Sequence, residues 1–86
     1  MILKSYKKNI ALKNREVVIC YNLISENDDY HVECRIDGEE NRTKSTYAII
    51  TNFTKDKEKG IEFVEKLALN EVFPIHLTEI YEDLYE

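Results

Sequence analysis

The sequence predicts an α+β domain in which a four-stranded antiparallel meander is covered on one face by two C-terminal helices. Three observations lead to this prediction. Apolar and polar residues alternate in short segments up to residue 53, and from residue 54 onward apolar residues recur at helical spacing. The connections between the alternating segments are short, which favours sequential antiparallel strands. Strands therefore precede helices, in the order β-β-β-β-α-α.

The chain length and composition indicate one folded domain, residues 1–86, with the sheet in 1–53 and a helical hairpin in 54–86. Glycine and proline are scarce, and 43% of the residues are hydrophobic, which is not typical of a disordered chain. No apolar run is long enough to span a bilayer, and the N-terminus lacks the apolar core of a signal peptide. We therefore expect a cytoplasmic protein.

The first two strands are predicted at 2–12 and 16–24. In the first, Tyr6 and Ile10 point to one side, and lysines near the middle suit an edge strand, where charge prevents unwanted pairing. The second segment is apolar on both faces, from Val17 to Ile24, which is typical of a central strand.

The third segment alternates from His31 to Asp37, and its register can be predicted. A two-residue turn at Asn27-Asp28 leaves Asn22 outside the core, whereas a slip by one residue would bury it. The pairs expected on the helix side are Leu23 with Val32, Tyr21 with Cys34, and Ile19 with Ile36; those expected on the other side are Cys20 with Arg35 and Asn22 with Glu33.

The fourth strand is predicted at 46–53. Continuous alternation would place Tyr47, Ile49 and Phe53 on the helix side. Ala48 and Ile50 would then lie on the opposite face of the sheet. The residues expected beneath the helices are Tyr6, Ile10, Val17, Ile19, Tyr21, Val32, Cys34, Ile36, Tyr47, Ile49 and Phe53.

The helical hairpin begins at Thr54, which can cap the first helix. Gly60 inside this helix costs about 1 kcal/mol relative to alanine, which suggests a close approach of the backbone to another element. Pro74 disfavours a helical residue before it and suits the first position of a second helix. In that second helix, helical spacing relates the apolar residues Leu77, Ile80, Tyr81, Leu84 and Tyr85.

The sequence lacks the motifs that are typical of nucleotide-binding, zinc-binding and nucleic-acid-binding proteins. Two isolated glycines cannot form a phosphate-binding loop. Cys20, Cys34, His31 and His76 lack the spacing of a zinc site, and His31 and Cys34 are predicted on opposite faces. The net charge of −5 argues against direct nucleic-acid binding. We therefore expect no catalytic residue, no cofactor, no metal, no nucleic-acid partner and no membrane partner.

Two surfaces are candidates for protein interaction. The predicted uncovered sheet face would carry the apolar residues Val18, Cys20, Ile24, Ala48 and Ile50. Stacking of this face would give a homodimer, and a larger partner protein is the alternative.

The terminal helix supplies the second candidate surface. Tyr81 and Tyr85 could pack on the sheet or could anchor a partner. His76 lies in the first turn of that helix, three residues before Glu79, which could accept its N–H. The structural interpretation is an exposed residue near a helix start. The alternative function, a small enzyme or accessory subunit that uses His76 with a nearby carboxylate, would require a pocket.

Charge is unevenly distributed along the chain. Residues 1–15 contain five basic and no acidic residues, and residues 67–86 contain five acidic and no basic residues. The acidic end would suit a basic partner, for example a nucleic-acid-binding protein that it blocks. We therefore interpret the chain as a small regulatory protein-interaction module that binds a partner protein or itself.

The C-terminal third contains a proline-histidine-leucine step followed by an acidic helix, in residues 74–84, PIHLTEIYEDL. This stretch resembles the C-termini of a family of short, uncharacterised proteins of low-GC Gram-positive bacteria. The resemblance covers the last third of the chain and implies no activity. It directs attention to Pro74, His76, Glu82 and Asp83.

Overall fold

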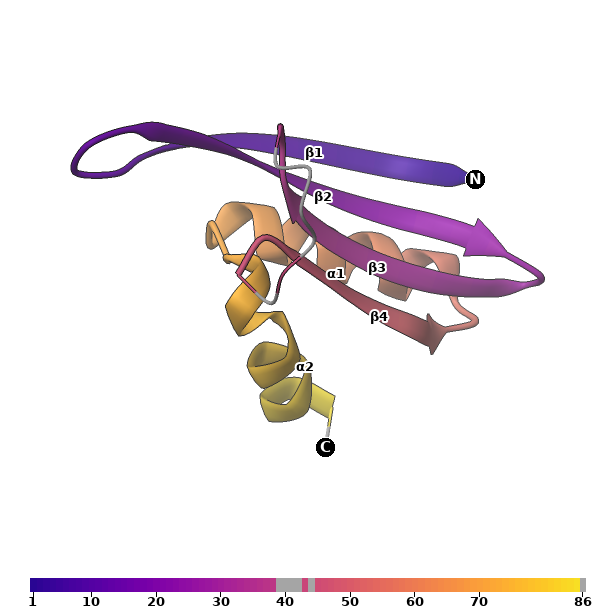
Figure 1. Ribbon diagram of the computed structural model, residues 1–86. Helices are drawn as coiled ribbons and strands as arrows, with labels where there is room; N and C mark the ends of the chain where they lie inside the picture. Colours follow the sequence, from indigo (N-terminus) through magenta and orange to yellow (C-terminus); the bar gives the residue numbers. More distant parts are fainter. Residues whose placement is uncertain (39–42, 44, 86) are drawn as a thin grey trace.

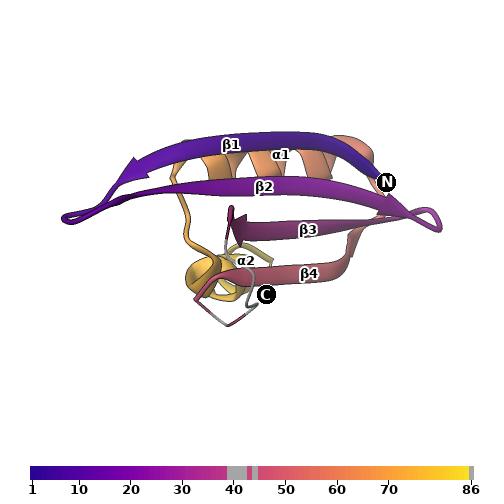
Figure 2. The ribbon, with the colours of Figure 1, turned by 45° about the horizontal axis from the view of Figure 1, so that its top comes forward.

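The sheet occupies the first 54 residues of this computed structural model, which describes residues 1–38, 43 and 45–85. Strands β1 (Ile2–Ala11), β2 (Glu16–Glu26), β3 (Asp29–Ile36) and β4 (Tyr47–Thr54) form an antiparallel sheet in the order β1-β2-β3-β4. They are followed by α1 (Lys57–Leu69), the 3-10 turn η1 (Pro74–His76) and α2 (Leu77–Tyr85). Both helices lie on the same side of the sheet (Figure 1, Figure 2). The predicted fold class is confirmed.

The β2–β3 hairpin has the predicted register. Asn27 and Asp28 have φ angles of 51° and 68°, and two positive values in succession are the mark of a type I′ turn. This turn matches the twist of the two strands and fixes which residues are opposite one another. The observed pairs include Leu23 with Val32, Tyr21 with Cys34, Ile19 with Ile36, Cys20 with Arg35, and Asn22 with Glu33.

β1 is an edge strand, as predicted from its lysines. It pairs with β2 through Tyr6 opposite Tyr21 and Ile10 opposite Val17. Both Tyr6 and Ile10 pack against the core between the sheet and the helices, which confirms their predicted side.

The predicted orientation of β4 is wrong for four residues. Ala48 pairs with Cys34 and Ile50 with Val32, so Ala48 and Ile50 face the helices and pack against the core. Tyr47 and Ile49 pair with Arg35 and Glu33 on the open face.

A bulge in β4 explains this error. Tyr30 pairs with Thr54 and Val32 with Ile50, so the three residues 51–53 lie opposite His31 alone. Asn52 has a φ of 51°, and its backbone N–H donates to Nδ1 of His31 at 2.8 Å. The extra residues interrupt the alternation, so Phe53 faces the helices together with Ala48 and Ile50.

α1 covers the sheet and contacts all four strands. Its buried residues recur at helical spacing: Gly60, Phe63, Val64, Leu67 and Ala68. A Cβ atom added at Gly60 would lie 2.8 Å from Cδ1 of Leu23. The glycine therefore allows the helix backbone to approach β2 closely, as the sequence suggested.

The start of α1 differs from the prediction. Asp56, rather than Thr54, is the N-cap, and its carboxylate accepts from the backbone N–H groups of Glu58 and Lys59. Thr54 Oγ1 instead accepts from the N–H of Asp56 at 3.0 Å. Two short polar side chains therefore share the turn between β4 and α1, and the charged one caps the helix.

The segment between the helices is tied to the centre of the sheet. The hydroxyl of Tyr21 donates to the carbonyl of Val72 at 2.8 Å, and the thiol of Cys34 lies 3.7 Å from the same oxygen. Pro74 is the first residue of η1, and α2 then turns away from the sheet (Figure 1). α2 packs against β4 and η1, so it lies at one edge of the sheet, whereas α1 covers all the strands.

Candidate functional site

A groove of about 300 Å³ lies between α1 and α2. Its floor is formed by core residues, because Phe63, Leu67 and Val72 line the groove and are almost completely buried. The remaining lining residues belong to the rims: Lys66 and Asn70 on the α1 side, and Ile80, Asp83 and Leu84 on the α2 side. The groove is therefore mainly apolar, with a basic residue on one rim and an acidic residue on the other.

The burial of α2 decreases along its length, and this keeps the groove open. Leu77, its first residue, is fully buried, and Ile80 and Tyr81 are half-buried. Leu84, the last residue but one of the helix, is 47% exposed. The apolar stripe predicted from the sequence is thus covered at its start and uncovered towards its end.

Three aromatic rings hold the two walls of the groove in position. Phe53 of β4 stacks on Phe63 of α1 with ring centroids 4.7 Å apart. The same ring meets Tyr81 of α2 edge-on at 5.7 Å. Tyr81 therefore packs on the edge of the core. Tyr85, the other predicted tyrosine anchor, ends α2, and its side chain lies outside the described residues.

The helical part of the chain is acidic, whereas the sheet part is neutral. Residues 1–56 contain nine basic and nine acidic residues, and residues 57–86 contain three basic and eight acidic residues. The whole net charge of −5 therefore belongs to the helical part. On α2, Glu79, Glu82 and Asp83 are all exposed, and the helix contains no lysine or arginine.

His76 lies beside these acidic residues at the end of η1. Its Nδ1 atom is 3.0 Å from Oε2 of Glu79, as the sequence suggested. Together with Ile80, Glu82 and Asp83 the two residues line a shallow hollow. The side chains of His76 and Glu79 are 60% and 73% exposed, so water reaches both groups. This hollow adjoins the groove, because Ile80 and Asp83 line both.

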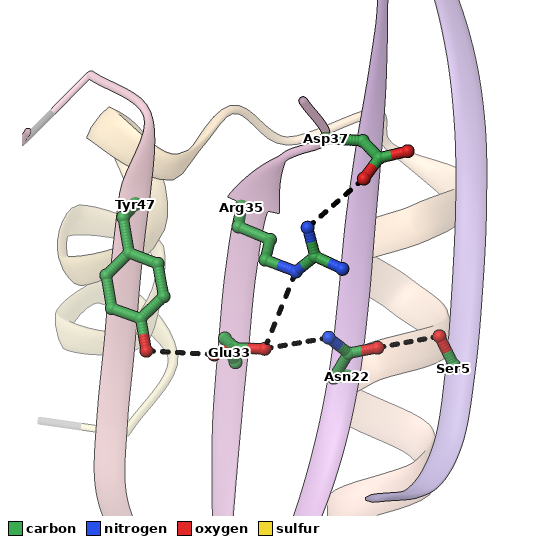
Figure 3. A network of polar contacts seen from close by, with 6 residues as sticks. All are labelled: Ser5, Asn22, Glu33, Arg35, Asp37 and Tyr47. Carbon is green, nitrogen blue, oxygen red and sulfur yellow. Dashed lines mark hydrogen bonds and ion pairs between the residues drawn. The ribbon is translucent and has the colours of Figure 1, made fainter. Parts of the chain in front are cut away.

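The open face of the sheet is crossed by a row of polar contacts (Figure 3). Ser5 donates to Oδ1 of Asn22 at 2.6 Å, and Nδ2 of Asn22 donates to Glu33 at 2.8 Å. The hydroxyl of Tyr47 donates to the other oxygen of Glu33 at 2.8 Å. The row thus takes one side chain from each of the four strands.

An arginine extends this row along β3. Nε of Arg35 lies 4.0 Å from Glu33, and Nη1 of Arg35 lies 3.2 Å from Asp37. Because both carboxylate oxygens of Glu33 already accept from neutral donors, this group is held by its neighbours and is not presented to a ligand. We therefore interpret the row as a structural feature that stabilises the pairing of the strands, and not as a reactive site.

The open face does not carry the apolar patch in the form that the sequence predicted. Val18 and Ile24 do lie on the open face, and both are half-buried. Cys20 is only 1% exposed and lies between its cross-strand partners Lys7 and Arg35. With Ala48 and Ile50 on the other face, the predicted patch is not a continuous apolar surface.

Part of this row could be found from the sequence, and part could not. The predicted register placed Asn22 opposite Glu33, which is the signal for a polar pair outside the core. Tyr47 was missed because the predicted alternation of β4 turned it towards the helices. The groove was also missed, because the sequence shows an apolar stripe on α2 but does not show where the sheet beneath it ends.

Cys20 and Cys34 are free cysteines on opposite faces of the sheet. Burial raises the pKa of the Cys34 thiol to about 12, and the nearby Cys20 and Glu33 act in the same direction. Burial also raises the pKa of Tyr21. Within the described part of the chain, no group of three or more His, Cys, Asp or Glu residues could hold a metal ion. Across the same residues, no helix has the length and apolar character needed to cross a membrane.

Comparison with known proteins yields one match. The model of a family of unknown function (DUF6514) matches residues 1–86. No curated protein and no solved structure matches the chain.

Proposed function

Since the chain belongs to a family of unknown function (DUF6514), we propose from its geometry that it is a small protein-interaction module that binds a partner in the groove between α1 and α2. The module acts by binding and not by catalysis. Its role is regulatory, because a binding module without a reaction of its own acts through the partner that it occupies.

The exposed apolar wall of the groove is the observation that supports this proposal. Leu84 is 47% exposed beside a floor of almost completely buried side chains. Covering a leucine of this kind stabilises a complex by about 1–2 kcal/mol, so such a wall provides an anchor for a partner. Concave apolar surfaces with a few polar groups at the rim are typical of binding sites.

The groove suits binding better than His76 suits catalysis. The distance of 3.0 Å between His76 and Glu79 would allow proton transfer, and this geometry favours an enzyme as the second candidate function. However, both side chains are more than half exposed, and an open hollow neither excludes water nor strengthens electrostatic interactions with a substrate.

Self-association is a weaker form of the same proposal. The open face of the sheet was the first candidate for a homodimer, but its apolar residues are separated by the polar row of Ser5, Asn22, Glu33 and Tyr47. A partner of a different kind is therefore preferred. A cytoplasmic location is part of the same proposal, and two free cysteines are compatible with a reducing compartment.

A pair of matched variants tests the role of the groove. Leu84→Asp places a charge on the groove wall, and Leu69→Asp places the same charge at the end of α1, where Leu69 is 70% exposed and does not line the groove. Both variants should fold. Tagged wild-type protein and Leu69→Asp should retain the same partner from an extract of cells that naturally make the protein, and Leu84→Asp should lose it.

Sedimentation velocity at several concentrations accompanies this capture experiment. The proposal predicts that the wild-type protein alone sediments as a monomer. If the partner is retained equally by all three proteins, the groove is not the binding surface and the proposal is wrong.

A further inference from the structure

We infer that the groove between α1 and α2 binds an amphipathic α-helix of a partner protein whose flank beside α2 is basic. This inference rests on the proposed function and names its partner. It follows from the backbone of the groove, from its dimensions and from the distribution of charge on its two rims.

The backbone of the groove favours a helix over an extended peptide. Most of the described backbone along the groove belongs to α1 and α2 and is hydrogen-bonded within them. The carbonyl of Val72, between the helices, already accepts from Tyr21 at 2.8 Å. An extended peptide would find no strand edge to pair with and would lose the hydrogen bonds that it makes to water. A helix satisfies its own backbone, so it needs only an apolar surface.

The dimensions of the groove match about two turns of such a helix. The groove extends along α1 from Phe63 to Asn70, which corresponds to about 10 Å at the rise of an α-helix. Apolar side chains at positions i, i+3 or i+4, and i+7 of the bound helix would lie over Phe63, Leu67 and Leu84. The bound helix would therefore take the place that a third helix occupies in a small bundle.

The charges on the two rims determine which flank of the bound helix is basic. On the α2 side, Asp83 is exposed on the rim, and Glu79 and Glu82 are exposed in the adjoining hollow. α2 contains no lysine or arginine. On the α1 side, Lys66 is exposed on the rim. A bound helix with lysine or arginine on the flank next to α2 would meet opposite charges on that side. Basic residues next to Lys66 would be repelled, so the basic flank lies on one side only.

The α2 helix of a second copy of this chain does not have the basic flank that the groove requires. The apolar stripe of α2 is flanked by the same acidic residues, so a second α2 in the groove would bring acid against acid. Five of the twelve basic residues lie in β1 and the following loop, which form an edge strand and a turn. α1 carries three more, but its apolar side is already buried against the sheet. The occupant is therefore a different protein.

Three synthetic peptides test this inference with the full-length protein. The first has leucines at i, i+3, i+4 and i+7, lysines on one flank of this stripe and uncharged polar residues elsewhere; the second has glutamates in place of the lysines; the third contains the residues of the first in an order without an apolar stripe. Binding is followed by NMR through the amide signals of Phe63, Leu67, Ile80 and Leu84, at low and high salt.

The lysine peptide should shift the groove signals, and its affinity should decrease with salt. Leu84→Asp should weaken its binding by about tenfold or more, since the lost apolar contact is replaced by a charge. Asp83→Lys should weaken it by about fivefold, and the control Glu62→Lys, an exposed charge reversal on α1 outside the groove, should change it less than about twofold.

Four other results of the peptide titrations would contradict the inferred partner or the inferred site. If the glutamate peptide shifts the groove signals as strongly as the lysine peptide, the groove is a binding site but its partner is not basic. If the peptide without a stripe binds equally well, charge alone is responsible, and the groove is not the site. If the groove signals shift with protein concentration before peptide is added, a second copy occupies the groove, and the inferred partner is wrong. If no peptide shifts these signals, the inferred helical partner is wrong, and the capture experiment with Leu84→Asp and Leu69→Asp then decides separately whether the groove binds any partner.

Discussion

The two helices share an amphipathic pattern, but they are buried to very different extents. α1 has five buried residues and contacts every strand of the sheet. In α2, among the residues whose side chains the structure describes, only Leu77 is fully buried, and it is the first residue of the helix. The same kind of apolar stripe thus forms a core where it lies over the sheet. Beyond the sheet edge it remains partly exposed and can bind a partner.

Leu77→Asp should have the largest effect, because it removes the anchor of α2. The side chain of Leu77 is completely buried, and an unpaired carboxylate at this position costs several kcal/mol, comparable with the whole stability of a small domain. We expect loss of cooperative unfolding, measured by circular dichroism during urea and thermal denaturation.

Leu84→Asp provides the control on the same helix, because Leu84 is nearly half exposed. Its free energy of unfolding should change by less than about 1 kcal/mol. If Leu77→Asp unfolds cooperatively at the wild-type midpoint, α2 is not docked on the sheet and the two helices do not differ in the way described.

High pH should selectively weaken the contact between the sheet and the segment that joins the helices. Burial raises the pKa of Cys34 from 9.0 to about 12, so the folded protein keeps a proton that the unfolded chain releases above about pH 9. The stabilisation is complete below pH 9 and is lost between about pH 9 and 12, at most about 1.4 kcal/mol per pH unit for this group. Tyr21, whose pKa is also raised by burial, adds a loss in the same direction at the upper end of this range.

The pH dependence can be measured from urea midpoints between pH 8 and 11 in the wild-type protein and in Cys34→Ala. The variant should be less stable at neutral pH, because a buried side chain is shortened. Its stability should also decrease less steeply between pH 9 and 11. Equal slopes in the two proteins would mean that the thiol of Cys34 is not protected from titration in the folded state.

The sequence predicted the centre of the sheet better than its edge, for a physical reason. In β2 and β3 a slip by one residue would exchange Val32 and Cys34 for Glu33 and Arg35 on the core side, so only one register is acceptable. In β4 both faces offer apolar side chains, because Tyr47 and Ile49 are as apolar as Ala48 and Ile50. Hydrophobicity therefore cannot select a face.

The deciding feature of β4 is the bulge at residues 51–53. It depends on the positive φ of Asn52 and on the hydrogen bond from its N–H to His31, a residue on another strand. A pattern within β4 alone cannot reveal such a contact. The candidate groove was hidden for a related reason. The stripe and the acidic residues of α2 are visible in the sequence, but its position beyond the sheet edge is a property of the assembled fold.

Gly60→Ala should reveal how closely α1 is fitted to the sheet. Alanine improves the intrinsic helix propensity by about 1 kcal/mol, but its Cβ would lie 2.8 Å from Cδ1 of the fully buried Leu23. Because overpacking of a core typically costs about 1–3 kcal/mol, we expect a net loss of about 1 kcal/mol in the free energy of unfolding.

The same substitution in a Leu23→Val background supplies the control, since valine has no Cδ atoms to obstruct the new methyl group. There Gly60→Ala should become neutral or stabilising, which a double-mutant cycle from urea denaturation would detect. Destabilisation of equal size in both backgrounds would place the obstacle somewhere other than Leu23.

His76→Ala should change the free energy of unfolding least, because His76 lies at the exposed end of the molecule and not in its core. His76 is 60% exposed, and its contact with Glu79 at 3.0 Å is a surface pair of the kind that contributes about 0–1 kcal/mol. We expect a change below about 0.5 kcal/mol, equal within error to that of Thr78→Ala at an exposed neighbouring position. A loss of several kcal/mol would show that η1 depends on this side chain for its position. A small loss of stability together with an unchanged affinity for the lysine peptide would show that His76 contributes little to the fold and nothing to binding in the groove. It would leave the acidic residues of α2 and the wall at Leu84 as the surface that recognises the partner.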